Sequence, residues 1–270
     1  MSRLQESWLL SLKRDIAAYE QDLFKKTGLD FIGIAAAAND ISRNNICKAA
    51  ERFKVAVVTV TAGLGAIRGF AESVAAILSQ AGFRAEVMSQ TDVSGLDNVY
   101  TTPGIGFVFL ADDKKYIGLN LNRRRISENS SATAGGYVAA LEAMCPGGLT
   151  GKDVLMMGYG KVGKLAAQNL VIKGANPILF EKNATSRELG ASFGFRICHE
   201  IEEIKKYSYI LDATNEGGWL TPDLLHENAI ISAPGVPLSL TDAAAKKYGN
   251  RLVHDLLHIG TLSMLGALCR

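Results

Sequence analysis

The residues best suited to chemistry in this chain form a glycine-rich turn in its second half. An apolar run over residues 154–157 leads into Gly158-Tyr159-Gly160-Lys161-Val162-Gly163, and a helical pattern follows. In a Gly-x-Gly-x-x-Gly turn the first glycine permits the tight bend, the second lets the backbone approach a pyrophosphate, and the third lets the helix lie close to the sheet. The helix start adds N–H groups and a partial positive charge. The turn therefore predicts a dinucleotide site, with an ordinary strand-to-helix turn as the alternative.

An acidic residue stands where the ribose of such a dinucleotide would lie. Residues 177–181 are expected to form the next strand, and Glu181 ends it. A carboxylate about 20 residues after the turn accepts hydrogen bonds from the adenosine ribose, and it would repel a 2′-phosphate. The sequence therefore favours NAD over NADP as the cofactor.

Two further strand ends in the second half are expected to contact the nicotinamide portion of the cofactor. Thr214 and Asn215 follow the apolar run 209–212, and Pro234 and Gly235 follow the run 229–232. Ligands of open α/β sheets bind outside the carboxyl ends of the strands. These four residues are therefore predicted to bind the cofactor, mainly through their backbones. His254, Asp255 and His258 lie near the same predicted site, where structural use of a histidine is the alternative to catalysis.

A second glycine-rich turn lies in the first half of the chain. Thr61-Ala62-Gly63-Leu64-Gly65 follows an apolar run and precedes an expected helix. Backbone N–H groups at a helix start favour a carboxylate or a phosphate. Because no acidic residue closes the following strand as in a nucleotide site, we expect Ala62 and Gly63 to bind a substrate carboxylate. A plain tight turn without a ligand is the alternative.

Acidic and amide side chains follow another apolar run of the first half. Ala111-Asp112-Asp113 comes directly after residues 106–110, and Asn129 lies further along the chain. A carboxylate at the end of a buried parallel strand could hold a substrate ammonium group through a charge-assisted hydrogen bond. An Asp-Asp turn leading into a hairpin is the structural alternative, and asparagine is itself common in turns and caps.

The elements that must position these residues alternate between strands and helices. In the second half, short apolar runs separated by helical patterns indicate a parallel sheet with helices on both faces. These runs cover residues 154–157, 178–180, 195–198, 209–212, 229–232 and 252–253. In the first half, the patterns predict strands at 54–61, 84–88, 106–110 and 116–121. They predict helices over 4–26 and 132–144, and a third helix that follows the turn at 62–65 and ends at about residue 80.

These elements predict an α/β protein with two lobes and a cleft between them. Residues 1–130 are expected to form an N-terminal α/β substrate-binding domain. Residues 131–270 are expected to form a Rossmann-type NAD-binding domain, which is a doubly wound parallel sheet. Within that domain, residues 257–270 are expected to return as a helix across the cleft.

Composition narrows the classes of partner. The 270 residues are 48% hydrophobic and 21% charged, and the net charge of +2 gives no reason to expect nucleic acid or an anionic membrane. No apolar stretch approaches the ~20 residues of a membrane span, and the N-terminus is amphipathic, unlike a signal peptide. Cys47, Cys145, Cys198 and Cys269 are scattered, which favours reduced thiols over a metal site or disulfides. We expect a cytoplasmic, metal-free protein that binds a small molecule.

Motifs outside the dinucleotide turn carry a more selective signal. They are Thr27-Gly-Leu-Asp30, Val60-Thr-Ala-Gly-Leu-Gly-Ala-Ile67, Phe70-Ala-Glu-Ser73, Asp92-Val-Ser-Gly95, Ala111-Asp-Asp113, Pro234-Gly-Val-Pro237 and Ile259-Gly-Thr-Leu-Ser-Met264. Together with the turn at Gly158–Gly163, and in this order over nearly the whole chain, they resemble the pyrrolysine synthase family. Members of this family are NAD-dependent 3-methylornithyl-lysine dehydrogenases.

The resemblance implies a specific reaction. The family oxidises the terminal primary amine of a methylornithine–lysine isopeptide to an imine or aldehyde. The neighbouring amine of the same ornithine then condenses with the oxidised carbon and loses water or ammonia, which closes the pyrroline ring of pyrrolysine. The substrate amine must first lose a proton, because a free alkylamine has a pKa of ~10.4. No residue is assigned as the general base.

The resemblance also implies roles for individual residues. The substrate contacts of the family correspond to Asp112, Asn129 and, as a weaker match, Leu4. The family pattern Thr-Ser-Gly appears here as Thr61-Ala62-Gly63, so a hydroxyl donor is missing and only backbone N–H groups remain for that contact. Glu181 stands where the family has an aspartate, which keeps the ribose acceptor.

Two other functions remain as alternatives. One is an NAD-dependent dehydrogenase that acts on another amino acid or diamine. The other is a non-catalytic regulator that binds NAD(H) with the same two lobes. Ala62 in place of the family serine is the feature of the sequence that favours these alternatives.

Overall fold

The computed structural model describes Glu6, Leu9 and residues 15–270, and it confirms the predicted α/β class. The chain divides into two compact units. Unit 1 contains residues 1–22, 30–136 and 257–270, and unit 2 contains residues 23–29 and 137–256. The chain therefore passes between the units within helix α2 (Ile16–Thr27) and within helix α7 (Asn129–Met144).

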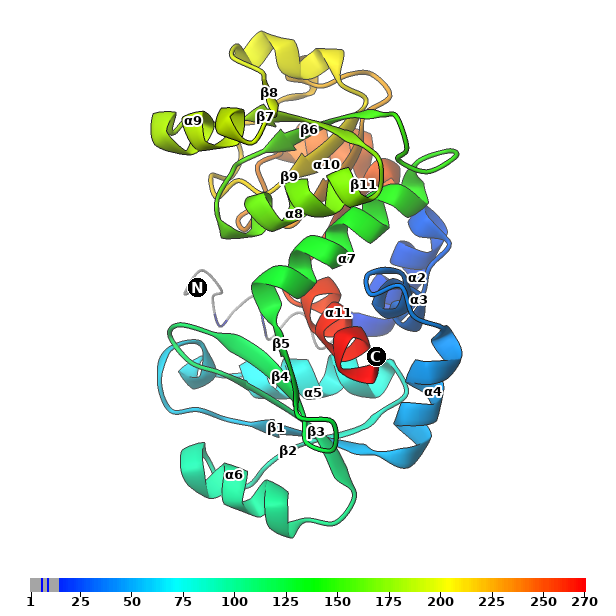
Figure 1. The fold of residues 1–270 in the computed structure, drawn as a ribbon, viewed down its shortest axis with the longest axis vertical. Helices are drawn as coiled ribbons and strands as arrows, with labels where there is room; N and C mark the ends of the chain where they lie inside the picture. The colour runs from blue at the N-terminus through cyan, green and yellow to red at the C-terminus, as the bar shows by residue number, and fades with distance from the viewer. Residues whose placement is uncertain (1–5, 7–8, 10–14) are drawn as a thin grey trace. The chain divides into compact units, whose positions relative to one another are not determined.

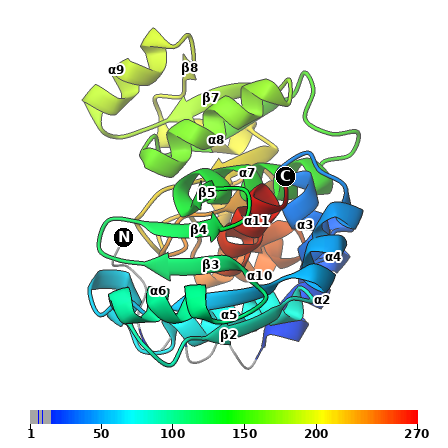
Figure 2. The ribbon, with the colours of Figure 1, turned by 60° about the horizontal axis from the view of Figure 1, so that its bottom comes forward.

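Within the described residues, unit 1 is built on a five-stranded mixed sheet in the order β2-β1-β3-β4-β5. Strands β1 and β2 and strands β1 and β3 pair in parallel, whereas β3, β4 and β5 pair antiparallel. Figure 2 shows β3 and β4 side by side. The strands are β1 (Lys54–Val58), β2 (Arg84–Val87), β3 (Ile105–Ala111), β4 (Tyr116–Asn120) and β5 (Arg125–Glu128).

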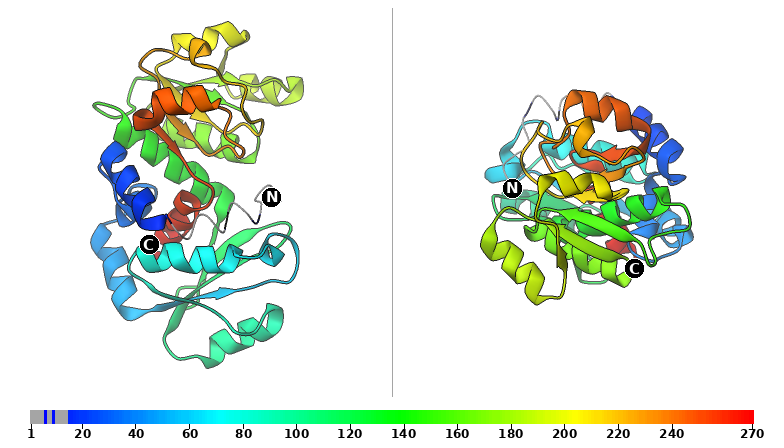
Figure 3. Two further views of the ribbon diagram at one scale, coloured as in Figure 1. Left: turned by 180° about the vertical axis from the view of Figure 1, so that it is seen from behind. Right: turned by 90° about the horizontal axis from the view of Figure 1, so that it is seen from above.

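Helices cover both faces of this sheet. Helices α5 (Phe70–Gln80) and α6 (Asp92–Thr101) lie on opposite faces, as the two views in Figures 1 and 3 show. Ala56 and Val58 of β1 pack with Val99 of α6 in one buried cluster. Because side chains alternate along a strand, Val55 and Val57 face the other layer. Helices α3 (Phe31–Ala37), α4 (Arg43–Arg52) and α11 (His258–Cys269) and the short helix η1 (Gly63–Ala66) complete the unit.

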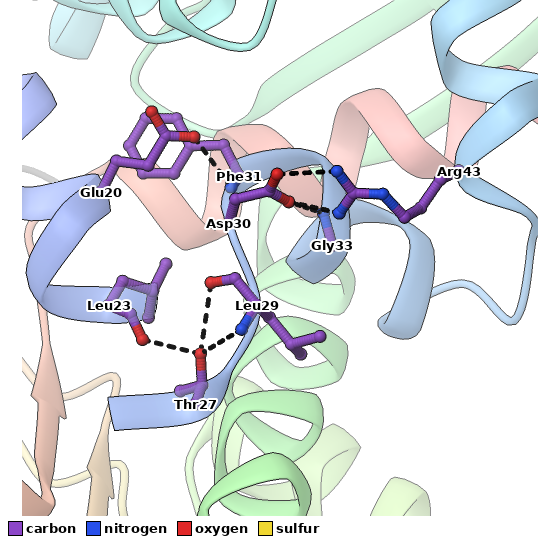
Figure 4. A network of polar contacts seen from close by, with 8 residues as sticks. All are labelled: Glu20, Leu23, Thr27, Leu29, Asp30, Phe31, Gly33 and Arg43. Carbon is purple, nitrogen blue, oxygen red and sulfur yellow. Dashed lines mark hydrogen bonds and ion pairs between the residues drawn. The ribbon is translucent and has the colours of Figure 1, made fainter. Parts of the chain in front are cut away.

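The start of α3 shows how the sequence determines a helix boundary. Asp30 is the N-cap residue, and its carboxylate accepts a hydrogen bond from Gly33 N at 2.7 Å. The same carboxylate pairs with both terminal nitrogens of Arg43 (Figure 4). In the same figure, Thr27 Oγ1 donates to Leu23 O at 2.7 Å and accepts from Leu29 N at 3.0 Å, which shapes the end of α2. The hydrogen bonds of Thr27 and the helix cap formed by Asp30 thus account for the motif Thr27-Gly-Leu-Asp30 without a ligand.

Unit 2 contains, within the described residues, a six-stranded parallel sheet in the order β11-β10-β9-β6-β7-β8. This is the doubly wound order, in which successive strands run outward from β6 on one side and from β9 on the other. The strands are β6 (Asp153–Met157), β7 (Asn176–Phe180), β8 (Arg196–Ile197), β9 (Tyr209–Asp212), β10 (Ile230–Ala233) and β11 (Leu252–His254).

Helices also cover both faces of the second sheet. Helix α8 (Lys161–Ile172) lies in front of the sheet in Figure 1, and α10 (Asp242–Tyr248) lies in front of it in the reverse view of Figure 3. The remaining helices are α9 (Ala184–Ser192), η2 (Ile201–Lys206), η3 (Pro222–Leu224) and η4 (Gly249–Arg251). Among the described residues, no helix is both long and apolar enough to cross a membrane.

The structure differs from the sequence-based expectations in three respects. First, residues 257–270 do form a helix, but that helix belongs to unit 1, and the main boundary falls at 136/137 instead of 130/131. Second, helices α3, α4 and α6 were not predicted, because each is only seven to ten residues long and so shows few repeats of a helical pattern. Third, the turn that begins at Thr61 does not lead directly into a long helix: its glycines form the short helix η1, and α5 begins only at Phe70.

Candidate functional site

The dinucleotide turn has the geometry that its glycines predict. Gly158 has φ +81°, in the left-handed region that favours glycine, and its N–H donates to Phe180 O at 2.9 Å. Gly160 is the extended N-cap residue of α8. At Gly163 a Cβ atom would overlap the carbonyl oxygen of Gly158, so only glycine lets α8 approach the strand this closely. The corner between β6 and α8 thus has the close backbone approach that a pyrophosphate site requires.

The carboxylate of Glu181 is part of this corner. Glu181 Oε2 accepts a hydrogen bond from Tyr159 N at 2.6 Å, and Oε1 accepts one from Asn183 N at 2.7 Å. Each carboxylate oxygen can accept a second hydrogen bond, so both remain able to bind ribose hydroxyls. The predicted ribose acceptor therefore lies against the glycine-rich turn, as a dinucleotide site requires.

Tyr159 takes part through its backbone. Its N–H is already used by Glu181, and its ring is 3% exposed and packs edge-on against Phe195 at a centroid distance of 5.9 Å. Burial raises the pKa of the Tyr159 hydroxyl. The backbone of Gly160, Lys161 and Val162 lies at the start of α8, the end of a helix at which N–H groups favour an anion.

Charged side chains surround the ribose position. Lys182 pairs with Glu216, and Arg187 Nη1 donates to the carbonyl oxygen of Glu181 at 3.0 Å. Both cations are thus already engaged with oxygen acceptors of unit 2. The carboxylates of Glu181 and Glu216 would oppose the charge of a further anion bound beside them, and the preference for NAD over NADP stays a prediction.

The residues predicted at the nicotinamide end lie at two neighbouring strand ends. Thr214 is half-buried and Asn215 is exposed after β9, and Pro234 and Gly235 follow β10. Gly235 N donates to Asp212 O at 3.0 Å, which joins the two segments. The structure brings these four residues together at the carboxyl edge of the sheet in unit 2.

The predicted substrate residues of unit 1 fall into two places. The first is the pair of loops after β1 and β3. Ala62 is exposed, and at Gly63 a Cβ atom would overlap Asp113, so the two loops are in contact. Asp92 accepts hydrogen bonds from Thr61 N at 2.9 Å and from Thr61 Oγ1 at 2.8 Å, which holds the first loop. These bonds lower the pKa of Asp92.

Asp112 combines a turn role with an exposed charge. Its Oδ1 accepts hydrogen bonds from Lys115 N and Lys114 N, both at 2.8 Å, so the carboxylate shapes the turn between β3 and β4. These two bonds lower the pKa of Asp112, and the side chain is exposed. The structural alternative for Asp112 is therefore present in the structure, and Oδ2 is the oxygen left for a substrate ammonium group.

The second place in unit 1 is the start of α7. Asn129 Oδ1 accepts a hydrogen bond from Thr133 Oγ1 at 3.2 Å, and both side chains lie against Gly260 of α11. Nearby on α11, Thr261 Oγ1 is hydrogen-bonded to the buried hydroxyl of Tyr116 at 2.9 Å. Burial raises the pKa of Tyr116. The C-terminal motif Ile259–Met264 thus supports Asn129, and Leu4 lies outside the described residues.

The histidines and the acid near the predicted site have structural contacts. His254 Nδ1 is hydrogen-bonded to Ala233 O at 2.8 Å. His258 is 5% exposed and stacks on Tyr19 with ring centroids 4.4 Å apart. Tyr137 Oη donates to Asp255 Oδ2 at 2.9 Å, and burial together with this negative charge raises the pKa of Tyr137.

Two acids organise the predicted loops, and sequence reasoning gave neither of them a role of its own. Asp92 holds the loop of unit 1, and Asp212 holds the segment after β9, where contacts to the nicotinamide are predicted. Asp92 belongs to the motif Asp92-Val-Ser-Gly95, and Asp212 directly precedes Ala213 and Thr214. The position of each acid next to a predicted binding loop was the sequence signal from which its role in holding that loop could have been predicted. Within the described residues, no group of three or more His, Cys, Asp or Glu side chains could hold a metal ion.

Comparisons with known proteins agree with this geometry. Residues 9–127 match a model of the N-terminal domain of the pyrrolysine biosynthesis protein PylD. The chain is 32% identical over 272 residues to a pyrrolysine synthase of Methanosarcina acetivorans, and the match covers 98% of each chain. It is 30% identical over 265 residues to a pyrrolysine synthase of Methanosarcina barkeri, covering 98% of this chain and 97% of the relative.

A solved structure supports the fold. Shikimate dehydrogenase of Aquifex aeolicus matches 79% of this chain and 90% of its own, with a TM-score of 0.52 and 14% sequence identity. At this identity the likeness concerns the arrangement of strands and helices alone. It agrees with the doubly wound sheet of unit 2.

Proposed function

Because the chain belongs to the pyrrolysine synthase family, we propose that it catalyses the last step of pyrrolysine biosynthesis. The reaction is the NAD-dependent oxidation of the terminal amine of 3-methylornithyl-lysine, followed by ring closure. The observation that carries this proposal is the similarity over 98% of both chains, which includes the motifs of unit 1 as well as the dinucleotide corner. A shared dinucleotide fold alone would not select this substrate.

The chemistry balances with one oxidation and one condensation. NAD, when bound, accepts two electrons and one hydrogen from the carbon that bears the amine, and a proton is released. The carbon–nitrogen single bond thereby becomes an imine. The second amine of the ornithine adds to this carbon and ammonia leaves, or water leaves if the imine is first hydrolysed to an aldehyde. Ring closure needs little assistance, because nucleophile and electrophile belong to one molecule.

The residues of unit 2 fit the adenosine and diphosphate parts of NAD. The backbone at Gly160, Lys161 and Val162 would bind the diphosphate, since it begins a helix behind a tight glycine turn. The carboxylate of Glu181, held by Tyr159 N, would accept the ribose hydroxyls and disfavour a 2′-phosphate. This arrangement supports NAD over NADP.

The residues of unit 1 would hold the substrate. Asp112 offers a carboxylate oxygen to an ammonium group, and Asn129 offers an amide that can donate and accept. The backbone N–H groups of Ala62 and Gly63 would bind a carboxylate, without the hydroxyl that the family serine supplies. An aspartate is ionised in the neutral range, and the two turn hydrogen bonds lower the pKa of Asp112 further, so the charge that an ammonium contact requires is present. Leu4 is included in this proposal on the resemblance alone.

The test is an assay with purified protein, NAD and the synthetic isopeptide. We expect formation of NADH, which is monitored by the absorbance of the reduced nicotinamide. We also expect a product with the mass of pyrrolysine, which is detected by mass spectrometry. Free ornithine, free lysine and the isopeptide lacking the methyl group serve as comparison substrates. Absence of NADH formation with the isopeptide at every pH would contradict the proposal.

The same assay separates the two alternatives. A higher kcat/KM for a free diamine than for the isopeptide would identify a dehydrogenase with another substrate. Tight NADH binding without turnover of any amine would identify a regulator. Ala62 is the position to examine if the isopeptide binds weakly, and Ala62→Ser would then restore the family hydroxyl and lower the KM for the isopeptide.

A further inference from the structure

Asp212 is a fully buried carboxylate at the carboxyl end of β9. Its exposed fraction is 0%, and it lies next to the hydrophobic core of unit 2. Aspartate is almost never fully buried unless it has partners, because removing a carboxylate from water costs several kcal/mol. A buried acid at this position therefore requires a set of donors.

The donors come from both strand ends that are predicted to contact the nicotinamide. Asp212 Oδ1 accepts hydrogen bonds from Thr214 N at 3.0 Å and from Thr214 Oγ1 at 2.6 Å. Asp212 Oδ2 accepts a hydrogen bond from the hydroxyl of Ser239, which is also fully buried. One side chain thus ties the segment after β9 to the segment after β10.

Backbone contacts link the same point to the dinucleotide corner. Asp212 pairs in register with Met157, the last residue of β6, and Ala213 N donates to Met157 O at 2.8 Å. The strand order places β6 and β9 side by side, at the point where the order of successive strands reverses direction across the parallel sheet. Ligands of doubly wound sheets bind at this switch point. Asp212 therefore lies at the topological centre of the proposed cofactor site.

The hydrogen bonds also determine what Thr214 can offer to a ligand. A threonine hydroxyl has one hydrogen to donate and two lone pairs with which to accept. Thr214 Oγ1 gives its hydrogen to Asp212, so toward a ligand it can only accept. The ring end of NAD carries a carboxamide, whose NH2 group is a donor of matching chemistry.

We propose that Asp212 is a positioning residue of the cofactor site: it holds the Thr214 hydroxyl as a hydrogen-bond acceptor for the carboxamide NH2 group of the nicotinamide. Asp212 itself touches neither the cofactor nor the substrate. Ser239 holds the second oxygen of the carboxylate and so fixes its orientation. This inference rests on the proposed function, because it requires a nicotinamide dinucleotide in unit 2.

The test compares NAD with an analogue in which a methyl ketone replaces the carboxamide, so that the NH2 donor is absent. Binding of both is measured by calorimetry on the full chain, which does not depend on turnover. The Kd of the wild type should be lower for NAD than for the analogue by roughly five- to tenfold, which is the contribution of one hydrogen bond to binding. In Thr214→Val, and in Asp212→Ala, which leaves the Thr214 hydroxyl without its acceptor, this ratio should fall toward one.

Ser232→Ala is the matched control. Ser232 is a fully buried serine of the same unit whose hydroxyl donates to Tyr137 O at 2.7 Å and not to Asp212. Loss of the Ser232 hydroxyl should leave the ratio of the two affinities at the wild-type value. Ser239→Ala should lower this ratio.

An unchanged ratio in Thr214→Val overturns the inference, and this variant keeps the test decisive if Asp212→Ala does not fold. An unchanged ratio in a folded Asp212→Ala also overturns it, since the acid would then only stabilise the fold. In both cases NAD binding by the wild type leaves the proposed function intact. A wild type that binds neither dinucleotide overturns the inference and the proposed function together.

Discussion

At the scale of single residues, four carboxylates hold the loops that carry the predicted site residues. Glu181, Asp112, Asp92 and Asp212 each accept backbone or hydroxyl hydrogen bonds that fix a loop at a strand end. The first two were identified from the sequence, because acids at strand ends are recognisable along the chain. The partners of the last two, Thr61 and Ser239, are brought to them only by the fold. The chemistry at a strand end can thus be predicted more readily than the network that holds it.

Replacement of Glu181 should change the choice of cofactor. Glu181→Gln keeps one acceptor oxygen but removes the negative charge beside the ribose. We expect the KM for NAD to rise by about tenfold, as for the loss of a charge-assisted hydrogen bond, and the kcat/KM ratio of NADP to NAD to increase. Steady-state kinetics with both cofactors measures this ratio. Glu188→Gln, an exposed acid on α9, is the control, and an equal change in both variants would contradict the role of Glu181.

Replacement of Asp112 should affect the substrate and leave the cofactor unaffected. Asp112→Asn retains an oxygen for the turn bonds from Lys114 N and Lys115 N but loses the charge. We expect the KM for the isopeptide to rise by about ten- to a hundredfold, with the KM for NAD unchanged. Asp113→Asn is a control from the same turn. Equal losses for substrate and NAD would argue against a substrate contact at Asp112.

At the scale of secondary-structure elements, the sequence predicts those whose pattern is local. Strand β9 (Tyr209–Asp212) was predicted with the same bounds, since a short apolar run ending in a polar residue is a strong signal. Helix α6 was missed because it is only 10 residues long. In addition, its first residue, Asp92, has φ +52°, a backbone conformation that is uncommon for residues other than glycine and that the sequence does not indicate. Helix α11 was predicted as a helix, but it is buried nearly all round, so its sequence does not indicate which core it joins.

The cap of α3 allows an element-scale test of stability. Asp30→Ala removes both the cap and the ion pair with Arg43 and should cost about 1–2 kcal/mol of unfolding free energy. Asp30→Asn keeps the cap bond from Gly33 N and loses only the pair. Because both side chains are partly exposed, this pair should contribute less than about 1 kcal/mol. Urea denaturation of both variants measures the difference, and equal costs would show that the cap contributes nothing.

The pH dependence of this cap follows from its charge. Hydrogen bonding by Arg43 and then by Gly33 N lowers the pKa of Asp30 in the folded protein. The stabilisation is therefore complete above the unfolded pKa of Asp30 and is lost as the pH falls through the lower, folded pKa. The stability difference between the wild type and Asp30→Asn should shrink over that acidic range. A difference that stays constant below pH 4 would contradict the assignment.

At the scale of the whole molecule, neither unit is a continuous stretch of chain. Residues 257–270 complete unit 1, where Tyr116 and Asn120 of β4 are hydrogen-bonded to Thr261 and Leu268 of α11. The boundaries expected from sequence, 1–130 and 131–270, followed the strand and helix patterns and could not detect this return. Such long-range contacts depend on the complete fold.

Removal of the last helix should therefore weaken unit 1 selectively. In a chain that ends at Leu256, hydrogen–deuterium exchange should show loss of protection in β3, β4 and α5, while β6 and β9 keep theirs. The physical reason is that Leu265 and Leu268 are fully buried in unit 1, so their loss exposes its core. A chain that ends at Cys269 and lacks only the exposed Arg270 is the control. Loss of protection confined to β6–β11 would instead assign the segment to unit 2.

The position of α11 also bears on the order of events during synthesis. A ribosome releases the chain from its N-terminus, and domains generally fold as units while the chain emerges. Residues 137–256 are translated before α11, so the strands of unit 2 are all synthesised before unit 1 has its last helix. The half of the protein that is translated earliest must therefore wait for residues 257–270 before its own interior is closed, and a nascent chain stalled before these residues would present that interior to chaperones.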